Sequence, residues 1–170
     1  MLRTFIVENG MRLLFLARFS LRRIAKPISV SVRAIVHADH SQILLVQHTY
    51  VAGLYLPGGG IKLGEDAHEA IVRELKEEIG LSEMDVRSYE LIGIYLNEFG
   101  GGSDHIILFE VKAELQRLKE ICEASGGDDM EIACAVLANL DDLPHSLVSG
   151  SKRRILNWVG NQSEMFCGRW

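Results

Sequence analysis

One helix-forming segment constrains this chain more than any other, because it places acidic side chains beside the residues that it must bury. Helical periodicity runs from about Asp66 to Ile79 and stops at Gly80, a residue type that commonly ends helices. On a 3.6-residue period, Glu74 and Glu78 fall beside the apolar stripe rather than on the opposite, solvated side. Uncompensated charge in that position is unfavourable. The segment therefore predicts a counter-charge at this face of the helix.

The spacing of the carboxylates indicates what the counter-charge is. Glu74, Glu77 and Glu78 stand at i, i+3 and i+4, so their side chains share one face. A solvated acidic face is the ordinary interpretation of such a cluster, but the adjoining apolar stripe argues against it. Oxygen ligands suit Mg²⁺ or Mn²⁺ better than Zn²⁺, which favours His or Cys. We therefore expect a site for Mg²⁺ (or Mn²⁺) here.

A glycine-rich loop, Pro57-Gly58-Gly59-Gly60, runs towards this helix and can bring backbone amides close to phosphates. No Gly-Lys-Ser/Thr follows it, so it is not a Walker A loop. Loop and helix together fit a spaced pattern of glycine, acidic, basic and aliphatic positions: Gly59, Glu65, Arg73, Glu74, Leu75, Glu77, Glu78, Gly80 and Leu81. This pattern is the Nudix box. The chain resembles the Nudix hydrolase family, and within it the mutator-type nucleoside triphosphate pyrophosphohydrolases.

The resemblance implies a role for each matching position. The metal ligands would be Glu74, Glu77, Glu78 and the backbone carbonyl of Gly58. Arg73 would hold the loop against the helix through charge-assisted hydrogen bonds, and Gly59 and Glu65 would support the site. Family chemistry is attack of water on a phosphorus of a nucleoside diphosphate linked to another group. The metal neutralises the diphosphate and lowers the pKa of the attacking water.

The resemblance also indicates a catalytic acid outside the box. Glu131 lies 13 residues before Pro144, an offset at which the mutator-type enzymes carry an acidic ligand. Asp128 and Asp129 are the next candidates, and a box glutamate is a further alternative for the general base. The competing interpretation of Glu131 is a glutamate at a strand edge that faces water.

The remaining chain predicts an α+β fold. We expect strands at 29–37, 42–48, 54–56, 86–96, 105–113 and 131–137, loops at 100–103 and 124–129, and a last helix at 151–159. Residues 114–123 receive no prediction. This order indicates a Nudix-type α/β/α sandwich, a mixed sheet covered by helices on both faces, over residues 27–170.

Residues 1–26 lie outside the resemblance and read as a basic amphipathic helical extension. Their longest apolar run, Leu13 to Ala17, is too short to span a bilayer. We expect this extension to pack on its own domain or on a second subunit of a homodimer. Contact with a membrane surface is the less favoured alternative.

Composition bounds the partners. A net charge of -5 argues against a non-specific nucleic-acid binder and leaves a nucleotide-type small molecule as the expected substrate. Cys122, Cys134 and Cys167 form no close pair, so no disulfide framework or zinc spacing follows. A reducing cytoplasm is the simplest setting.

Our best prediction of the reaction is hydrolysis of a nucleoside triphosphate to a monophosphate and pyrophosphate. A proline about 15 residues after the box marks many ADP-ribose pyrophosphatases, and here that region reads Tyr95-Leu96-Asn97-Glu98. ADP-ribose or another nucleotide sugar remains an alternative substrate, and a non-catalytic nucleotide sensor is the alternative function. Residues that bind the base are not identified. Candidate walls are the turn at 48–50, residues 97–104 and the strand after Glu131.

Overall fold

A six-stranded mixed sheet forms the centre of the molecule in the computed structural model, which describes residues 28–99, 102–124, 131–160 and 166–170. The strands are β1 (Ile28–His37), β2 (Gln42–His48), β3 (Val86–Phe99), β4 (Gly102–Ala113), β5 (Ile132–Asn139) and β6 (Phe166–Arg169). Their order is β5-β2-β1-β4-β3-β6. The β1–β4 and β3–β6 pairs are parallel and the other pairs are antiparallel.

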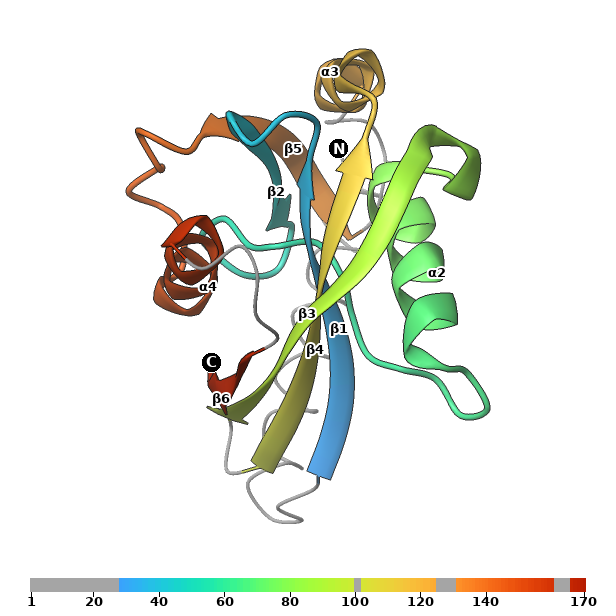
Figure 1. Ribbon diagram of the computed structural model, residues 1–170, viewed down its shortest axis with the longest axis vertical. Coiled ribbons are helices and arrows are strands. Elements are labelled where there is room, and N and C mark those ends of the chain that lie inside the picture. The colour runs from blue at the N-terminus through green and yellow to red at the C-terminus, as the bar shows by residue number, and fades with distance from the viewer. Residues whose placement is uncertain (1–27, 100–101, 125–130, 161–165) are drawn as a thin grey trace, which may run out of the picture.

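Helices cover both faces of this sheet (Figure 1). Helix α2 (Ala67–Ile79) packs on one face and α4 (Ser149–Gly160) on the other, while α3 (Leu115–Ala124) lies near the end of β5. A short 3₁₀ turn, η1 (Glu83–Asp85), precedes β3. The predicted α+β sandwich with a mixed sheet is confirmed.

The central strand β1 explains why there are two cores. Val32, Ala34 and Val36 pack into the core under α2, whereas Ile35 packs into the core under α4. All four side chains are fully buried. A parallel strand with both faces covered is apolar on successive residues, as β1 is here.

Helix α2 begins and ends where its sequence predicts. Asp66 is the N-cap and accepts a hydrogen bond from the Glu69 amide, and Glu69 completes the capping box. Gly80 ends the helix in the left-handed conformation, with φ 66°. Between these caps, burial of Ile71 and Leu75 sets which side of the helix faces the core and leaves Glu74 and Glu78 beside them.

Several elements and boundaries differ from the sequence prediction. The strand expected at 54–56 is not formed, because Leu54 and Tyr55 make only isolated β-bridges, to Leu147 and Val46. Helix α3 occupies a stretch left without a prediction, and β6 was not predicted. The predicted loop at 100–103 is shorter, because Gly102 and Ser103 belong to β4 and pair with Phe99 and Glu98. Strand β5 begins at Ile132, just after the predicted start.

Some predictions fall outside the described residues. These are the helical extension at 1–26, its membrane or subunit contact, and the alternative acids Asp128 and Asp129. Within the ranges that the structure describes, no helix is long and apolar enough to cross a membrane.

Candidate active site

The glycine-rich loop runs alongside β1 and makes backbone hydrogen bonds to its edge. The Ala34 amide donates to the Pro57 carbonyl and the Val32 amide to the Gly59 carbonyl, both at 2.9 Å. The Ile61 amide continues the pattern on the other side of the loop glycines, donating to the carbonyl of Val30 at 3.1 Å. Strand β2 pairs with β1 only near Val36 and His37, so the loop occupies the edge of β1 that β2 leaves open. The loop is therefore positioned by backbone bonds.

One loop position requires glycine, and a second leaves room for a side chain only if Glu74 moves. Gly58 has φ 130°, and a Cβ there would lie 2.4 Å from the Val32 carbonyl oxygen. A Cβ on Gly59 would lie 2.4 Å from a carboxylate oxygen of Glu74. This close approach brings the loop backbone against both β1 and the helix glutamates.

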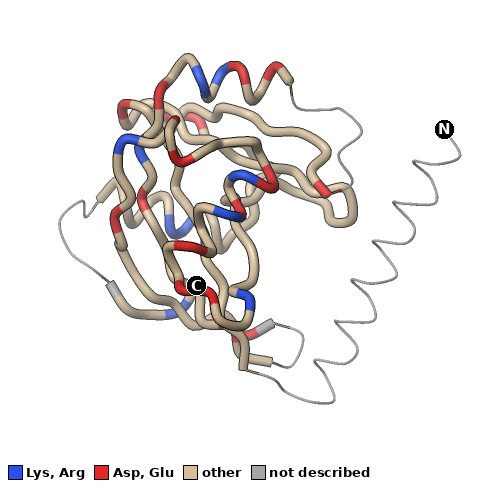
Figure 2. The backbone as a smooth tube through the Cα atoms, turned by 90° about the vertical axis from the view of Figure 1, so that its right-hand side faces the viewer, with Lys and Arg blue, Asp and Glu red and all other residues tan. Residues whose placement is uncertain are grey.

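Arg73 joins the loop to α2, the helix that faces the viewer in Figure 2 and carries both basic and acidic residues. Its Nε donates to Glu65 at 2.6 Å, and its NH2 donates to Glu65 at 2.9 Å and to the Gly60 carbonyl at 3.0 Å. Its NH1 donates to Glu74 at 2.7 Å and to Glu77 at 2.9 Å. The hydrogen bonds from Arg73 hold the pKa of Glu65 at about 2. These are the contacts that the predicted positioning role requires.

Glu74 and Glu77 both lie against Arg73 but differ in exposure. The Glu74 side chain is 13% exposed and the Glu77 side chain 53% exposed. Lys62 adds a second cation to Glu77 at 3.3 Å. Partial desolvation raises the pKa of Glu77, but the hydrogen bonds from Arg73 and Lys62 outweigh it and the net pKa is lowered. The lowered pKa keeps the Glu77 carboxylate available as an anion.

Glu78 has a different environment, because it points into the junction of loop and sheet. Its residue is 9% exposed, and its Oε2 accepts a 2.7 Å hydrogen bond from the Gly58 amide. Burial raises the pKa of Glu78 to about 8, against the lowering effects of the Arg33 charge and the Gly58 amide. A buried carboxylate of this kind is stabilised as an anion by a nearby cation.

Glu131 approaches Glu78 from the edge strand β5, whereas Glu78 lies on helix α2. It directly precedes β5, and its carbonyl accepts a 2.9 Å hydrogen bond from the Thr49 amide at the end of β2. Its carboxylate accepts a 3.3 Å hydrogen bond from the Tyr50 hydroxyl. The pKa of Tyr50 is raised by burial and by the charge of Glu131. The predicted distant acid thus lies beside a box glutamate.

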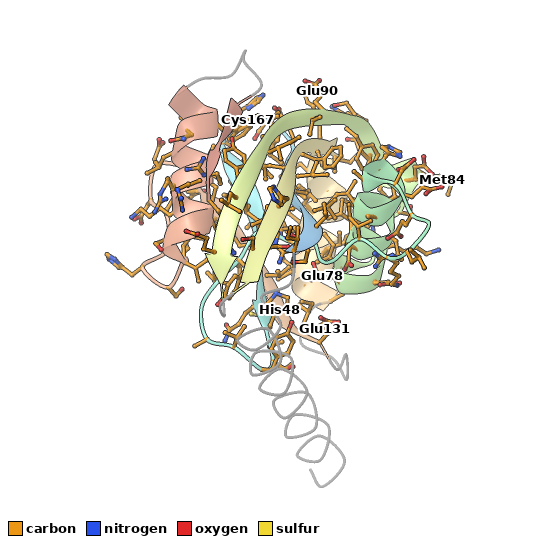
Figure 3. All side chains as sticks on the ribbon, turned by 90° about the horizontal axis from the view of Figure 1, so that it is seen from below. His48, Glu78, Met84, Glu90, Glu131 and Cys167 are labelled. Atoms are coloured by element: carbon orange, nitrogen blue, oxygen red, sulfur yellow. The ribbon has the colours of Figure 1, made fainter. Side chains whose placement is uncertain are left out.

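His48 belongs to the turn that the sequence offered only as a candidate wall of the base pocket, and its place beside the glutamates was not predicted. It ends β2, and one of its ring nitrogens lies within 4.8 Å of carboxylate oxygens of Glu78 and Glu131. Seen from below in Figure 3, these three labelled residues lie together. Its Nδ1 is buried and has no hydrogen-bond partner among the described residues. Burial, followed by the charge of Arg33, lowers the pKa of His48 to about 4.

A divalent cation fits this set of side chains. Two carboxylates and a neutral imidazole nitrogen are ordinary ligands for such an ion. The His48 ring, which carries an unpartnered buried nitrogen, and the buried carboxylate of Glu78 are the groups that a cation would satisfy. Glu74 and Glu77 are not members of this 4.8 Å set, so their part in metal binding stays a prediction. The same holds for the carbonyl of Gly58.

A second cluster among the described residues has similar spacing but a structural role. His37 Nε2 donates to Glu110 at 2.8 Å, and Trp158 donates to the other Glu110 oxygen at 2.8 Å. The His40 amide donates to His37 Nδ1 at 3.3 Å. These bonds already use both ring nitrogens of His37 and both oxygens of Glu110. They tie β1, β4 and α4 together, and Trp158 is a core residue.

Comparison with models of protein families identifies the family to which this site belongs. The family model described as NUDIX domain matches residues 27–159. The chain belongs to the Nudix family. The predicted Nudix box thus lies in a true Nudix domain, with its glutamates on α2 and its glycines against β1.

Relatives of known name accompany the family match. An ADP-ribose pyrophosphatase from Methanocaldococcus jannaschii is 35% identical over 81 residues, 46% of this chain and 46% of the relative. The match therefore spans about half the length of that curated relative. This Nudix domain also resembles a MutT NUDIX hydrolase from Burkholderia pseudomallei, with TM-score 0.61, 20% identity and coverage of 78% of this chain and 98% of that one.

A third likeness supports the same fold. A NUDIX hydrolase from Nitrosomonas europaea superposes with TM-score 0.62 at 19% identity, covering 82% of this chain and 94% of that one. At these identities the structural likeness shows the shared Nudix fold alone.

Proposed function

We propose that this Nudix domain hydrolyses the diphosphate linkage of a nucleoside diphosphate derivative with a divalent cation. The observation that carries the proposal is the meeting of Glu78 and Glu131 beside the Gly58 amide, in a chain of this family. The cation would be held by Glu78, Glu131 and the other box glutamates, and it supplies charge neutralisation of the diphosphate and activation of the attacking water.

The side chains divide the remaining work. Glu131 receives the proton of the attacking water, because it is exposed and reaches the same point as Glu78. Tyr50 orients the Glu131 carboxylate through its hydroxyl. Arg73 is a positioning residue, since it bonds the Gly60 carbonyl and the glutamates together.

Two substrates are proposed within this class. ADP-ribose is favoured by the name of the curated relative that shares 35% identity over part of the chain. A nucleoside triphosphate, cut to a monophosphate and pyrophosphate, is favoured by the offset of Glu131 from Pro144 and by the absence of a proline near Tyr95. The box glutamates do not distinguish the two, since both present a diphosphate to the cation.

Product analysis across ATP, GTP, their oxidised forms, ADP-ribose and dinucleoside polyphosphates, each with Mg²⁺ or Mn²⁺, tests the proposal. We expect the protein to hydrolyse one class of these nucleotides, and we expect EDTA to abolish that hydrolysis. Highest kcat/KM for ADP-ribose with inert triphosphates selects the first substrate, and the reverse selects the second. Tight nucleotide binding without turnover of any compound would instead identify a nucleotide sensor.

A further inference from the structure

His48 and Glu131 meet because the ladder between β2 and β5 is irregular. The register passes from Gln47 opposite Cys134 to His48 opposite Ile132, so one residue of β5 is skipped. In a regular ladder His48 would face the skipped residue, and Glu131 would lie one position further from it. A β-bulge of this kind re-aims side chains and is common next to functional sites. Here it brings the His48 ring and the Glu131 carboxylate to one point.

The ring of His48 is held by aromatic neighbours. Its centroid lies 5.2 Å from the Tyr50 ring and 5.5 Å from the Tyr55 ring. Packing of this kind would be served equally well by phenylalanine, since it uses only the faces and edges of the ring. It gives no use to the buried Nδ1, which has no partner among the described residues. Buried polar atoms are normally bonded, so this nitrogen calls for a ligand.

The surroundings limit what that ligand is. A nitrogen lone pair accepts a proton or binds a metal ion, and one of the two ring nitrogens of His48 lies within 4.8 Å of the Glu78 and Glu131 carboxylate oxygens. We propose that His48 is a nitrogen ligand of the divalent cation beside Glu78 and Glu131, and that the site therefore prefers Mn²⁺ to Mg²⁺. This inference rests on the proposed function only in placing the catalytic cation at Glu78.

The preference follows from ligand chemistry. Mg²⁺ favours oxygen ligands and keeps much of its water, whereas imidazole nitrogen binds first-row transition ions more readily. The sequence prediction considered only the oxygen ligands of the three box glutamates and did not include His48. With His48 included, the ligand set is mixed and Mn²⁺ gains more from it than Mg²⁺ does.

The test uses Mn²⁺ as its own probe in the full-length protein. Electron spin echo envelope modulation of bound Mn²⁺ should show coupling to one ¹⁴N nucleus in the wild type. His48→Phe keeps the ring and removes both nitrogens, so the coupling should vanish and the Kd for Mn²⁺ should rise about tenfold or more. The Kd for Mg²⁺, measured by calorimetry, should change by a smaller factor.

Two further variants make the result decisive. His40→Asn alters the other histidine-containing cluster and suits the left-handed backbone there, φ 59°, so the coupling should persist. His48→Asn offers an oxygen in place of nitrogen, and should bind Mn²⁺ without ¹⁴N coupling even if His48→Phe folds poorly. Coupling that survives in both His48 variants, or disappears in His40→Asn, would overturn the proposal.

Turnover separates this inference from the proposed function. Expected ¹⁴N coupling in a protein that hydrolyses no nucleotide supports the ligand and refutes the enzyme. Efficient metal-dependent hydrolysis with no ¹⁴N coupling supports the proposed enzyme and refutes His48 as a metal ligand.

Discussion

At the scale of single residues, the three box glutamates are not equivalent. Glu74 and Glu77 are tied to the guanidinium of Arg73, whereas Glu78 is bonded to a backbone amide and lies beside Glu131. The difference arises from their positions on α2, because Glu78 reaches the Gly58 amide and the Glu131 carboxylate while Glu74 and Glu77 reach Arg73. Glu77 and Glu78 therefore make separate predictions.

Glu78 makes the folded protein sensitive to alkali when the metal is removed. Its pKa is about 8 in the folded state against 4.5 for an unperturbed group, so the folded state binds the extra proton between these values. Stability in EDTA therefore falls as pH rises through that window, by at most about 1.4 kcal/mol per pH unit. Glu78→Gln should remove this slope, so that its stability gain over wild type grows between pH 5 and pH 8.

Urea unfolding at several pH values in EDTA measures this difference. Comparing the two proteins at each pH cancels the histidines whose pKa values are lowered, His37 and His48, which have the opposite slope below pH 6.5. A constant difference between the variants across pH 5 to 8 contradicts the buried, proton-binding description of Glu78.

Glu77 tests the box prediction itself. Glu77→Gln should leave the fold intact, because the side chains have the same shape, and should lower activity about 10²-fold through loss of a metal ligand. The exposed Glu83 provides a matched control, and Glu83→Gln should be silent. Near-normal turnover of folded Glu77→Gln at saturating metal would restrict the ligands to the set around Glu78.

Glu131 tests the assignment of the base. Glu131→Gln keeps the Tyr50 contact but cannot accept a proton, so kcat should fall about 10²-fold or more while KM changes little. Steady-state kinetics at saturating metal measure the split. An unchanged kcat would transfer the role to a box glutamate or to Asp128 or Asp129.

At the scale of elements, the site depends on the loop that completes the edge of β1. Gly58→Ala should destabilise the protein by about 1–3 kcal/mol from backbone strain alone and reduce activity, since the new Cβ meets the Val32 carbonyl. Gly60→Ala is the matched control, because a Cβ there meets nothing within 4 Å and its φ is ordinary. Its stability should stay within about 0.5 kcal/mol of wild type.

Thermal unfolding and metal-dependent turnover of the two alanine variants measure the contrast. Equal behaviour of Gly58→Ala and Gly60→Ala would show that the close approach of the loop to β1 does not limit folding or catalysis.

Elements whose signals are local were predictable. Helix α2 carries its cap at Asp66 and its stop at Gly80, so its bounds followed from the sequence. Helix α3 also carries a local signal, because Leu118 and Ile121 stand at helical spacing and are buried, although the sequence prediction does not include this helix. Strand β6 has no local signal. Its four residues become a strand only by pairing with Gly93 to Leu96 of β3.

The candidate site divides in the same way. Arg73 and the box glutamates follow from a contiguous pattern, and Glu131 from an offset to Pro144. His48 could not be found in this manner, because its place depends on a bulge between β2 and β5, whose pairing residues are far apart in sequence. A slip of one residue in a strand pair leaves no trace in composition or periodicity.

At the scale of the whole molecule, one central strand serves both cores and the site. Strand β1 contributes Val32 and Ala34 to one core and Ile35 to the other. Its two edges are also distinct, with β4 along one edge and the loop and β2 sharing the other. The loop of the site therefore rests on the central strand β1, while Glu78 comes from helix α2 and Glu131 from the residue that precedes β5.

This shared edge gives the molecule a built-in reporter of loop opening. The amides of Val32 and Ala34 donate to loop carbonyls, whereas the amides of Arg33 and Ile35, which alternate with them along β1, face β4. Detachment of the loop alone would expose the Val32 and Ala34 amides to exchange with deuterium and leave the Arg33 and Ile35 amides protected. Amide exchange should therefore slow at Val32 and Ala34 when the cation binds and stay constant at Arg33 and Ile35, which makes two neighbouring backbone positions read two different events.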